Sequence, residues 1–467
     1  MAYYGDDFTG STDVLESLEL GGVPTALFVS PPTREQWALH PKARALGVAG
    51  VSRRMSPAQM NEALPAAFAA LVAHQPRFLH YKVCSTFDSS PQVGSIGRAI
   101  ELGQKICHNR VTPLLVAAPS LGRYCAFGNL FARTGRSGEV ERLDRLATMA
   151  AHPVTPMREA DLRRHLAAQS AVPVVLVNVL TLDRGVEETL AALDRAPDGS
   201  VALFDAIHDE HLATVGYVID ELQMREGRPL LVVGSSGIER ALLSHWNRAR
   251  ETSVGQDTAE PFTRPPRVKT VGPILVLSGS CSPVTSRQIA AALAQGFVDV
   301  PLDIPRLLES SEVEAELRKQ IADVAANAYA VGRSVVVHSH LDAVDDGFVA
   351  QANSEVGAIL GRLLMEILPI AAFGRIVVAG GDTSGHVARV AGISSLKLVS
   401  PLEPGAPLCV AESPDRRVDG LEFVFKGGQI GSDEFFSHAR TAGWDAVASA
   451  QSPDFTSDRL EQPSIRT

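Results

Sequence analysis

Short apolar runs rich in Val, Leu and Ile alternate with longer amphipathic or Ala-rich stretches along nearly the whole chain of 467 residues. Buried parallel strands have such runs, and the connections between parallel strands are long and usually helical. Between the runs, Leu or Ile recurs every three to four residues, for example at 12–20, 93–107, 159–168 and 208–224, which predicts helices. In the first half we expect strands at 3–4, 25–29, 45–51, 78–83, 113–117, 173–179, 201–204 and 230–233. The alternation predicts an α/β fold with mainly parallel sheets flanked by helices.

The alternation is interrupted from residue 250 to 273, where the sequence is polar, contains proline and has no hydrophobic period. Such a stretch is typical of a linker between domains. The apolar runs then resume in PILVLSGS, VDVPLD, SVVVHSH, RIVVAGG and LEFVFKGG. We therefore expect one domain at 1–249, a linker at 250–273, a second α/β domain at 274–447 and a polar tail at 448–467.

The composition excludes several functional classes. Asp and Glu outnumber Lys and Arg by 53 to 43, and a net charge of −10 without a basic patch argues against nucleic acid as the main partner. The five cysteines form no CxxC pair, which argues against a disulfide framework or a structural zinc site and favours the reducing cytoplasm. No apolar run is long enough to span a membrane, and the start MAYYGDD is acidic where a signal peptide is basic. We expect a cytoplasmic protein that binds small molecules.

The first candidate site is the segment GDDFTGSTD, directly after the first predicted strand. Open α/β sheets bind ligands at the carboxyl ends of their strands, so Asp6 and Asp7 are placed to act as a base. Residues 9–12 offer hydroxyl and N–H groups at a helix N-terminus, which favours an anion. The alternative is a solvated acidic turn in which Ser11 or Asp13 caps the helix.

A second polar segment, KVCSTFDSSP, begins at Lys82 at the end of another predicted strand. Lys82 offers a point charge for a carboxylate or phosphate, and the hydroxyl groups of Ser85 and Thr86 offer orienting hydrogen bonds. The residues SRR at 52–54 follow the third predicted strand, and a guanidinium group suits bidentate binding of a carboxylate. The alternatives are a Ser/Thr-rich capping loop with a surface lysine, and two solvent-exposed arginines.

Three glycine-rich loops follow apolar strands in the second half. They are SGSCSP at 278–283, GGDTSG at 380–385 and KGGQIG at 426–431. Small residues let backbone N–H groups approach a ligand closely, so several such loops in one domain suggest a nucleotide cradle. None matches the Walker pattern GxxxxGK[ST] or the dinucleotide pattern GxGxxG. The alternative for each loop is a tight turn with glycine at positive φ.

Histidine and cysteine indicate no further site. His338 and His340 alternate on a predicted strand and the other histidines are scattered, so we interpret them as structural or surface residues. Cys84 and Cys281 lie in candidate loops, but no histidine is placed by sequence to activate either thiol. Further loops that frame a crevice, with plain turns as the alternative, are expected at 128–133, 152–157 and 234–237.

Taken in order, GDDFTGSTD, KVCSTFDSSP, SGSCSPVT, GGDTSG and KGGQIG resemble the motifs of the four-carbon acid sugar kinase family, up to about residue 437. Members of this family have an N-terminal domain that binds a sugar acid and a C-terminal domain that binds a nucleotide. They phosphorylate the terminal C4 hydroxyl of tetronate-type acids with ATP. The resemblance implies an ATP-dependent phosphotransferase whose active site lies in the cleft between two domains.

The resemblance also implies roles for residues of the first domain. The family's DD-x-TG segment falls on Asp6, Asp7, Thr9 and Gly10, and its SR loop falls on Ser52 and Arg53. These positions imply contact with the substrate and its carboxylate. The family's K-V-D-S-T segment falls on Lys82, Val83, Cys84, Ser85 and Thr86. Cysteine in place of the acid resembles the branch that acts on 3-oxo acids.

For the second domain, the resemblance implies ATP contacts in the three glycine-rich loops. These residues are Ser278, Gly279, Ser280 and Ser282; Gly380, Gly381, Asp382, Thr383 and Ser384; and Lys426, Gly427, Gly428 and Gly431.

The residues and the resemblance together predict a mechanism. Asp7, or alternatively Asp6, accepts the proton of the C4 hydroxyl, while Arg53, Lys82 and the hydroxyls of 85–86 orient the acid. Amides of the glycine loops hold the triphosphate, and Asp382 supports Mg²⁺ or, alternatively, stabilises a turn. Closure across the hinge brings the domains together and excludes water.

Two other functional classes stay open at this point. A NAD-dependent hydroxy-acid oxidoreductase would suit the doubly wound halves, but its GxGxxG fingerprint is missing. A non-catalytic sugar-acid or nucleotide sensor would need no acidic pair. We expect a 3-oxo acid such as 3-oxo-tetronate or 3-oxo-isoapionate as the substrate, before threonate or erythronate, and we leave open whether the chain forms a homo-oligomer.

Overall fold

The computed structural model of the chain describes residues 1–133, 138–150, 155–252, 272–339 and 346–441. Most of the predicted linker and the whole predicted tail therefore lie outside the described residues, as do His340 and residues 152–154 of one expected loop. Among the residues described, no helix combines the length and the apolar character needed to cross a membrane.

The first half contains a parallel sheet in which each strand predicted from the sequence is present. Within the described residues its order is β2-β3-β1-β4-β11-β5-β10-β9. Only β5 is displaced, since it begins two residues before the expected start at 113. The strands are β1 (Ala2–Gly5), β2 (Thr25–Phe28), β3 (Ala45–Ala49), β4 (Phe78–Lys82), β5 (Val111–Leu115), β9 (Val174–Val177), β10 (Ser200–Phe204) and β11 (Leu230–Gly234).

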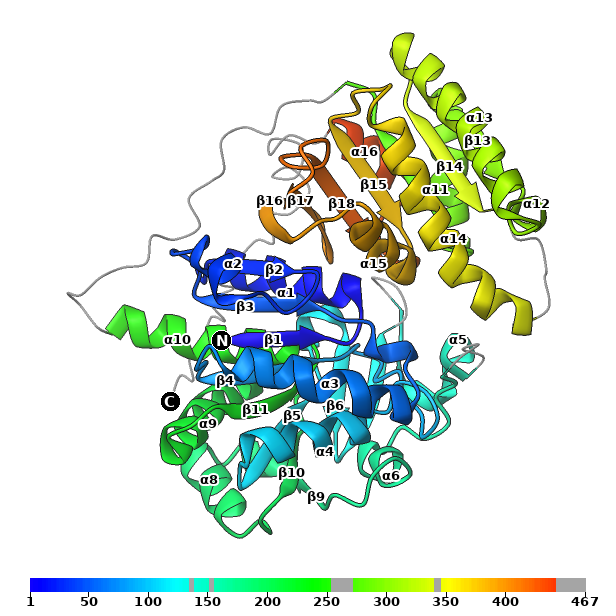
Figure 1. The fold of residues 1–467 in the computed structure, drawn as a ribbon. Helices are drawn as coiled ribbons and strands as arrows, with labels where there is room; N and C mark the ends of the chain where they lie inside the picture. The colour runs from blue at the N-terminus through cyan, green and yellow to red at the C-terminus, as the bar shows by residue number, and fades with distance from the viewer. Residues whose placement is uncertain (134–137, 151–154, 253–271, 340–345, 442–467) are drawn as a thin grey trace, which may run out of the picture.

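Helices cover both faces of this sheet (Figure 1). The first of them, α1 (Phe8–Leu20), begins four residues before the predicted start at Thr12. Asp7 is its N-cap, because its Oδ1 accepts the N–H of Gly10 at 2.8 Å, so a cap at Ser11 or Asp13 was the wrong expectation. The other helices are α2 (Arg34–Ala38), α3 (Pro57–Val72), α4 (Ile96–Cys107), α5 (Ala147–Ala150), α6 (Leu162–Ala167), α7 (Val179–Leu182), α8 (Val186–Asp194), α9 (Asp209–Glu226) and α10 (Gly237–Thr252).

A small antiparallel sheet was not predicted. It consists of β6 (Arg123–Ala126), β7 (Asn129–Arg133) and β8 (Val140–Arg142), so the expectation of a loop at 128–133 was wrong. The turn between β6 and β7 is Phe127-Gly128, with φ of 51° and 80°. Two-residue hairpin turns need positive φ at both positions, and a Phe-Gly pair is not the usual sequence for this turn. The carboxylate of Asp205 accepts both turn N–H groups, at 2.6 and 2.9 Å, and holds the turn in this form.

The second half has a parallel block and an antiparallel hairpin. The parallel strands, in the order β13-β14-β12-β15-β18, are β12 (Leu275–Ser278), β13 (Val298–Leu302), β14 (Val335–Ser339), β15 (Arg375–Ala379) and β18 (Glu422–Lys426). The hairpin of β16 (Ser395–Glu403) and β17 (Ala406–Glu412) was not predicted and adds to the edge at β18. The helices of this half are α11 (Pro283–Ala294), α12 (Ile304–Leu307), α13 (Ser311–Ala330), α14 (Asp346–Ile367), α15 (Gly381–Val390) and α16 (Phe435–Thr441).

The two halves share one sheet and one of the three clusters of buried apolar residues. β16 pairs with β2 through Ser395–Phe28 and Leu396–Leu27, so the fifteen strands of the large sheet are continuous within the described residues. The hairpin lies between the two halves (Figure 1). Helix α1 contacts β2 and β3 on one side and α15, β16 and β17 on the other. Its Phe8 ring lies 4.7 Å from that of Phe425 on β18. The predicted α/β fold with two parallel blocks is confirmed, and α1 and the hairpin join the blocks.

Candidate active site

The polar segments that follow the strands of the first half meet at one edge of the sheet. β3, β1, β4 and β11 are parallel neighbours, so the residues after their carboxyl ends lie side by side. A cleft of about 990 Å³ opens there and is lined by both halves. Of the predicted residues, those that line it are Asp7, Thr9, Gly10, Arg53, Lys82, Cys84 and Ser85. Glu403, Gly405 and Ile430 line it from the second half.

The acidic pair after β1 binds the guanidinium group of Arg53. Nε and Nη2 of Arg53 donate to the two carboxylate oxygens of Asp6 at 3.1 and 2.7 Å. Nη1 donates to Oδ2 of Asp7 at 2.8 Å. Arg53 is therefore neutralised by the chain's own carboxylates, whereas the sequence suggested that it binds a carboxylate of the substrate.

Asp6 and Asp7 differ in their environments. The Asp6 side chain is 3% exposed, and burial raises its pKa to about 6 against the lowering effect of Arg53. Asp7 is 14% exposed and lines the cleft. Its Oδ2 also accepts the hydroxyl of Thr9 at 3.1 Å. Because only Asp7 reaches the cleft, it is the member of the pair that a ligand can contact.

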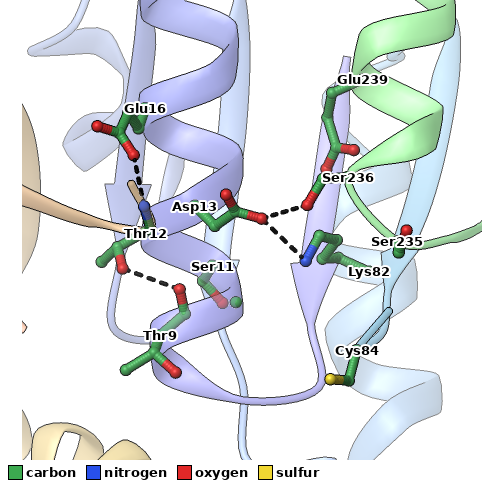
Figure 2. A network of polar contacts seen from close by, with 12 residues as sticks. Thr9, Ser11, Thr12, Asp13, Glu16, Lys82, Cys84, Ser235, Ser236 and Glu239 are labelled. Atoms are coloured by element: carbon green, nitrogen blue, oxygen red, sulfur yellow. Dashed lines mark hydrogen bonds and ion pairs between the residues drawn. The ribbon is translucent and has the colours of Figure 1, made fainter. Parts of the chain in front are cut away.

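Lys82 belongs to a polar network between β4, α1 and α10. Its Nζ lies 3.4 Å from Oδ2 of Asp13, which also accepts the hydroxyl of Ser236. Figure 2 shows Asp13 on α1 pointing toward Lys82 and Ser236, with Glu239 of α10 on the same side. Burial lowers the pKa of Lys82, but the charges of Asp13 and Glu239 raise it more, so its pKa lies above the usual value. Lys82 is thus a buried, charged lysine at the floor of the cleft.

The remaining predicted residues of the first half divide into two groups. Cys84 and Ser85 line the cleft, and burial raises the pKa of the Cys84 thiol to about 11, so the thiol is neutral at pH 7. The hydroxyl of Thr86 lies 2.8 Å from this thiol. The Ser52 side chain is completely buried and its hydroxyl bonds to Tyr81 at 2.9 Å. The structure therefore does not bring Ser52 to the cleft, because its hydroxyl holds the loop after β3 to β4.

The three glycine-rich loops of the second half also meet, because β12, β15 and β18 are neighbours. The hydroxyl of Thr285 on α11 donates to the carbonyl of Gly428 at 2.9 Å and lies 3.1 Å from the hydroxyl of Ser280. A Cβ at Gly279 would lie 2.4 Å from Oγ1 of Thr383. The loops are thus packed on one another, and their glycines are needed for the close approach.

Several residues predicted to contact the nucleotide also have contacts within the protein. Lys426 is fully buried, and its Nζ bonds to the Thr285 hydroxyl at 3.2 Å. Burial lowers the pKa of Lys426 to about 8 against the raising effect of Glu403. Ser278 and Ser384 are also fully buried, and Ser384 donates to the carbonyl of Gly380 at 2.7 Å. Ser282 is the N-cap of α11, and Gly431 has a φ of 94° against the ring of Phe435.

The start of α15 lies next to Asp7 of the acidic pair. Gly380 precedes the helix with a φ of 118°, and no side chain caps the first N–H groups. A Cβ at Gly381 would lie 3.5 Å from Oδ2 of Asp7, and one at Gly427 would lie 3.7 Å from Oγ1 of Thr9. Two nucleotide-side loops and the acidic segment thus converge at Thr9. Uncapped N–H groups at a helix N-terminus favour an anion at this junction.

An ion pair also crosses between the halves at this junction. Arg54 binds the carboxylate of Asp382 in the first turn of α15. Burial raises the pKa of Asp382, and the charge of Asp7 adds to this effect while Arg54 opposes it. Asp382 is therefore a largely buried carboxylate that lies between Arg54 and Asp7.

The described residues also contain a cluster that the sequence did not indicate, formed by Asp183, His208 and His211, whose ligand-type atoms lie within 4.8 Å of one another. The N–H of Ile207 donates to Nδ1 of His211 at 3.3 Å. In neutral His211 the proton is then on Nε2, which lies 2.9 Å from Asp183. This tautomer opposes metal binding through Nε2, so the cluster is a hydrogen-bonded connection between α7 and α9.

The sequence named Asp13 only as a possible helix cap, and it gave no role to Thr285 of α11. Ser236 lies in the loop 234–237 that was expected to frame a crevice, and it lines the cleft. Sequence reasoning missed Arg123 and Arg240, which also line the cleft. No local pattern distinguishes these two residues, because the cleft is formed by elements that only the fold brings together.

Comparison with known proteins places both halves. Residues 1–242 match a family model described as a sugar-binding N-terminal domain, and residues 275–436 match a nucleotide-binding C-terminal domain. The chain is 44% identical to a 3-oxo-isoapionate kinase of Paraburkholderia graminis over 94% of each chain. It is 28% identical to a 3-oxo-tetronate kinase of Pectobacterium atrosepticum over 93% of this chain and 97% of that one. A solved structure from Salmonella typhimurium LT2, 26% identical, superposes with a TM-score of 0.73 over 94% of this chain and 98% of that chain.

Proposed function

The chain belongs to the four-carbon acid sugar kinase family, and from this premise we propose that it transfers the γ-phosphoryl group of ATP to the terminal hydroxyl of 3-oxo-isoapionate or a closely related branched 3-oxo acid. The relative with 44% identity is a 3-oxo-isoapionate kinase, whereas 3-oxo-tetronate kinases are 26–31% identical. This difference supports the branched acid as the preferred substrate.

Of the three functional classes considered from the sequence, the relatives support the ATP-dependent sugar-acid kinase. The curated relatives cited above span nearly the whole chain and are kinases. The NAD-dependent oxidoreductase and the non-catalytic sensor are therefore set aside.

The observation that carries the mechanism is the approach of Asp7 to the start of α15. Phosphoryl transfer requires a base next to the attacking hydroxyl and N–H groups or cations next to the phosphate oxygens. Asp7 supplies the carboxylate at the cleft, and the uncapped N–H groups of α15 lie on its other side. We assign Asp7 as the base that accepts the hydroxyl proton. The hydroxyl oxygen then bonds to the γ-phosphorus as the bond to the β–γ bridging oxygen breaks and ADP leaves.

Asp6 and Arg53 position this base. Arg53 holds Asp7 at the edge of the cleft, while buried Asp6 holds Arg53 through both carboxylate oxygens. The charge-assisted contacts fix the orientation of the Asp7 carboxylate before substrate binds. In this scheme Asp6 acts through Arg53 and does not touch the substrate.

For the nucleotide, the residues with backbone N–H groups at the junction are Gly381, Asp382 and Gly427. Lys426, Thr285 and Ser280 hold the loops in this arrangement from behind. Mg²⁺ fits the carboxylate of Asp382 beside that of Asp7, because magnesium prefers carboxylate and phosphate oxygens. Asp382 would hold the ion, which supplies positive charge to the phosphates when bound.

The test is a coupled assay of ADP release with purified protein and Mg-ATP. The panel contains 3-oxo-isoapionate, 3-oxo-tetronate, threonate and erythronate. We expect the highest kcat/KM with 3-oxo-isoapionate. Mg-ATP should also raise the melting temperature by binding linkage. The kinase proposal fails if none of the acids stimulates ADP release, and the choice of substrate fails if 3-oxo-tetronate is the better acceptor.

A further inference from the structure

The sequence suggested that Arg53 binds the carboxylate of the substrate, but Asp6 and Asp7 already bind this arginine. Another basic residue is therefore needed for the substrate carboxylate. The cleft is lined by four basic residues, Arg53, Lys82, Arg123 and Arg240. Arg53 is bound by Asp6 and Asp7, and Lys82 lies against Asp13. Binding an anion at either position would compete with carboxylates already there. Of the four, Arg123 and Arg240 have no ion pair with any described residue.

Arg123 and Arg240 each have a buried Nε without a hydrogen-bond partner among the described residues, but only Arg123 has a guanidinium group fixed by backbone carbonyls. Nη1 of Arg123 is fixed by backbone carbonyls of Leu121, Gly122 and Arg133 at 3.2 to 3.4 Å. Its Nε is buried and has no hydrogen-bond partner among the described residues. The Nε–Nη2 edge, which suits bidentate binding of a carboxylate, is therefore unused. A buried donor without a partner is rare in native structures and indicates a missing acceptor.

The position of Arg123 is also compatible with the proposed base. Its backbone pairs with Ala118 at 2.9 and 3.2 Å, just after the end of β5. A Cβ at Gly237, the first residue of α10, would lie 2.0 Å from the carbonyl oxygen of Ala117. Ser236 precedes that glycine and bonds to Asp13, the partner of Lys82. Arg123 thus lines the same cleft as this network and Asp7.

Arg240 is less suitable because its charge acts on Glu16 of α1, a carboxyl group of the chain itself. Glu16 lies nine residues after Asp7, which is about 14 Å along the helix axis. A four-carbon acid spans only roughly 6 Å from its terminal hydroxyl to its carboxylate by ordinary bond lengths. An acid whose hydroxyl contacts Asp7 therefore ends well short of Glu16.

We propose that Arg123 binds the carboxylate of the sugar acid and so selects acids over uncharged polyols. The proposal rests on the kinase function proposed above. It assigns substrate binding to the β5–β6 connection, while Arg53 belongs to the base.

The test compares the acid substrate with its uncharged amide in the wild type, Arg123→Gln and Arg123→Lys. Loss of a charge-assisted hydrogen bond should lower kcat/KM for the acid by about tenfold to a hundredfold in Arg123→Gln, mainly through KM. The value for the amide should stay the same, so the acid-to-amide ratio falls. Arg123→Lys should recover part of the preference for the acid. The KM for ATP should be unchanged in both variants, which shows that the cleft is intact.

Two further variants complete the design. Arg195→Gln removes a charge at an exposed position outside the cleft and should leave the ratio unchanged. Arg53→Gln should lower kcat for acid and amide alike, because it disturbs Asp7. The proposal is overturned if the ratio of kcat/KM for the acid to that for the amide is unchanged in Arg123→Gln. It is also overturned if this ratio falls in Arg53→Gln instead. A wild-type protein without activity on any sugar acid would contradict the kinase function itself, so the two failures are distinguishable.

Discussion

At the scale of single residues, Arg53 lies where the motif predicts, but its guanidinium group is already bound by carboxylates of the chain. The sequence placed Asp6, Asp7 and Arg53 after neighbouring strands, and the structure brings the three together. Sequence cannot show which charges neutralise each other, because this depends on side-chain directions over a few ångströms. The same limit applies to Ser52 and Lys426, whose polar groups turn inward to Tyr81 and Thr285.

The assignment of the base predicts a specific loss in Asp7→Asn. The amide cannot accept the hydroxyl proton, so kcat should fall by about 10² to 10⁴. The KM for ATP should change little, since the phosphates are held by the second half. Steady-state kinetics with the best acid of the panel measures both. Asp209→Asn, an exposed position on the cleft wall, is the matched control and should keep wild-type kcat. Near-normal turnover in Asp7→Asn would remove the base assignment.

At the scale of elements, the parallel strands could be predicted because most are short runs of mainly apolar, buried residues, although β13 alternates, with Asp299 and Pro301 exposed. The two antiparallel hairpins could not. β6 and β7 are joined by a Phe-Gly turn whose positive φ values depend on distant Asp205, and β16 carries bulges that break its period. The cleft wall of α1 and α10 was missed for a related reason. Helix packing follows from tertiary contacts that no local pattern contains.

The start of α15 depends on a glycine at position 380. A Cβ there would be strained at a φ of 118° and would lie 2.8 Å from Oγ1 of Thr383. Gly380→Ala should therefore displace the first N–H groups of the helix and raise the KM for ATP, by about tenfold if the strain is 1 to 2 kcal/mol. The control is Gly392→Ala. Gly392, at the other end of α15, also has a positive φ, of 68°, but only Ser413 lies near its Cβ position. The control variant should cost stability without changing the KM for ATP, and equal effects in both variants would argue against a nucleotide role for Gly380.

The contact between α1 and the β16–β17 hairpin predicts a dependence of stability on pH. Burial raises the pKa of Glu16 to about 8, although the N–H of Gly405, which it accepts at 3.1 Å, lowers it. In the unfolded chain this carboxyl titrates near 4.5. Between these values the folded protein retains a proton that the unfolded chain has lost. The contribution of Glu16 to the free energy of unfolding therefore falls as the pH rises from about 4.5 to 8 and is constant above.

Glu16→Gln should remove this dependence, because glutamine is neutral and keeps an acceptor for Gly405. Relative to the wild type, the variant should gain stability as the pH rises from 5 to 8.5. Urea midpoints at pH 5, 7 and 8.5 measure the difference. Glu62→Gln, at an exposed position on α3, should show no such trend. A constant difference between Glu16→Gln and the wild type would mean that Glu16 titrates normally.

At the scale of the whole molecule, Phe8 connects the two halves. It is 1% exposed and its ring lies against Phe425 of the second half. Phe8→Ala should lower the free energy of unfolding by about 3 to 5 kcal/mol, as expected for a buried aromatic side chain. Leu39→Ala, at an exposed position, should change it by less than about 0.5 kcal/mol. Urea denaturation measures both. A small loss in Phe8→Ala would show that the two halves do not depend on this contact.

The pairing of β2 with β16 suggests that the two halves can associate even without a peptide connection. They contact each other through paired strand edges and packed aromatic rings, so each half has a surface complementary to the other. Fragments 1–252 and 272–467, produced separately, would each expose an unpaired strand edge, at β2 and at β16, and should aggregate. Produced together in one cell, they should find each other, copurify and form ADP when supplied with the acid and Mg-ATP. Such an outcome would show that the two halves can associate without the covalent connection between them.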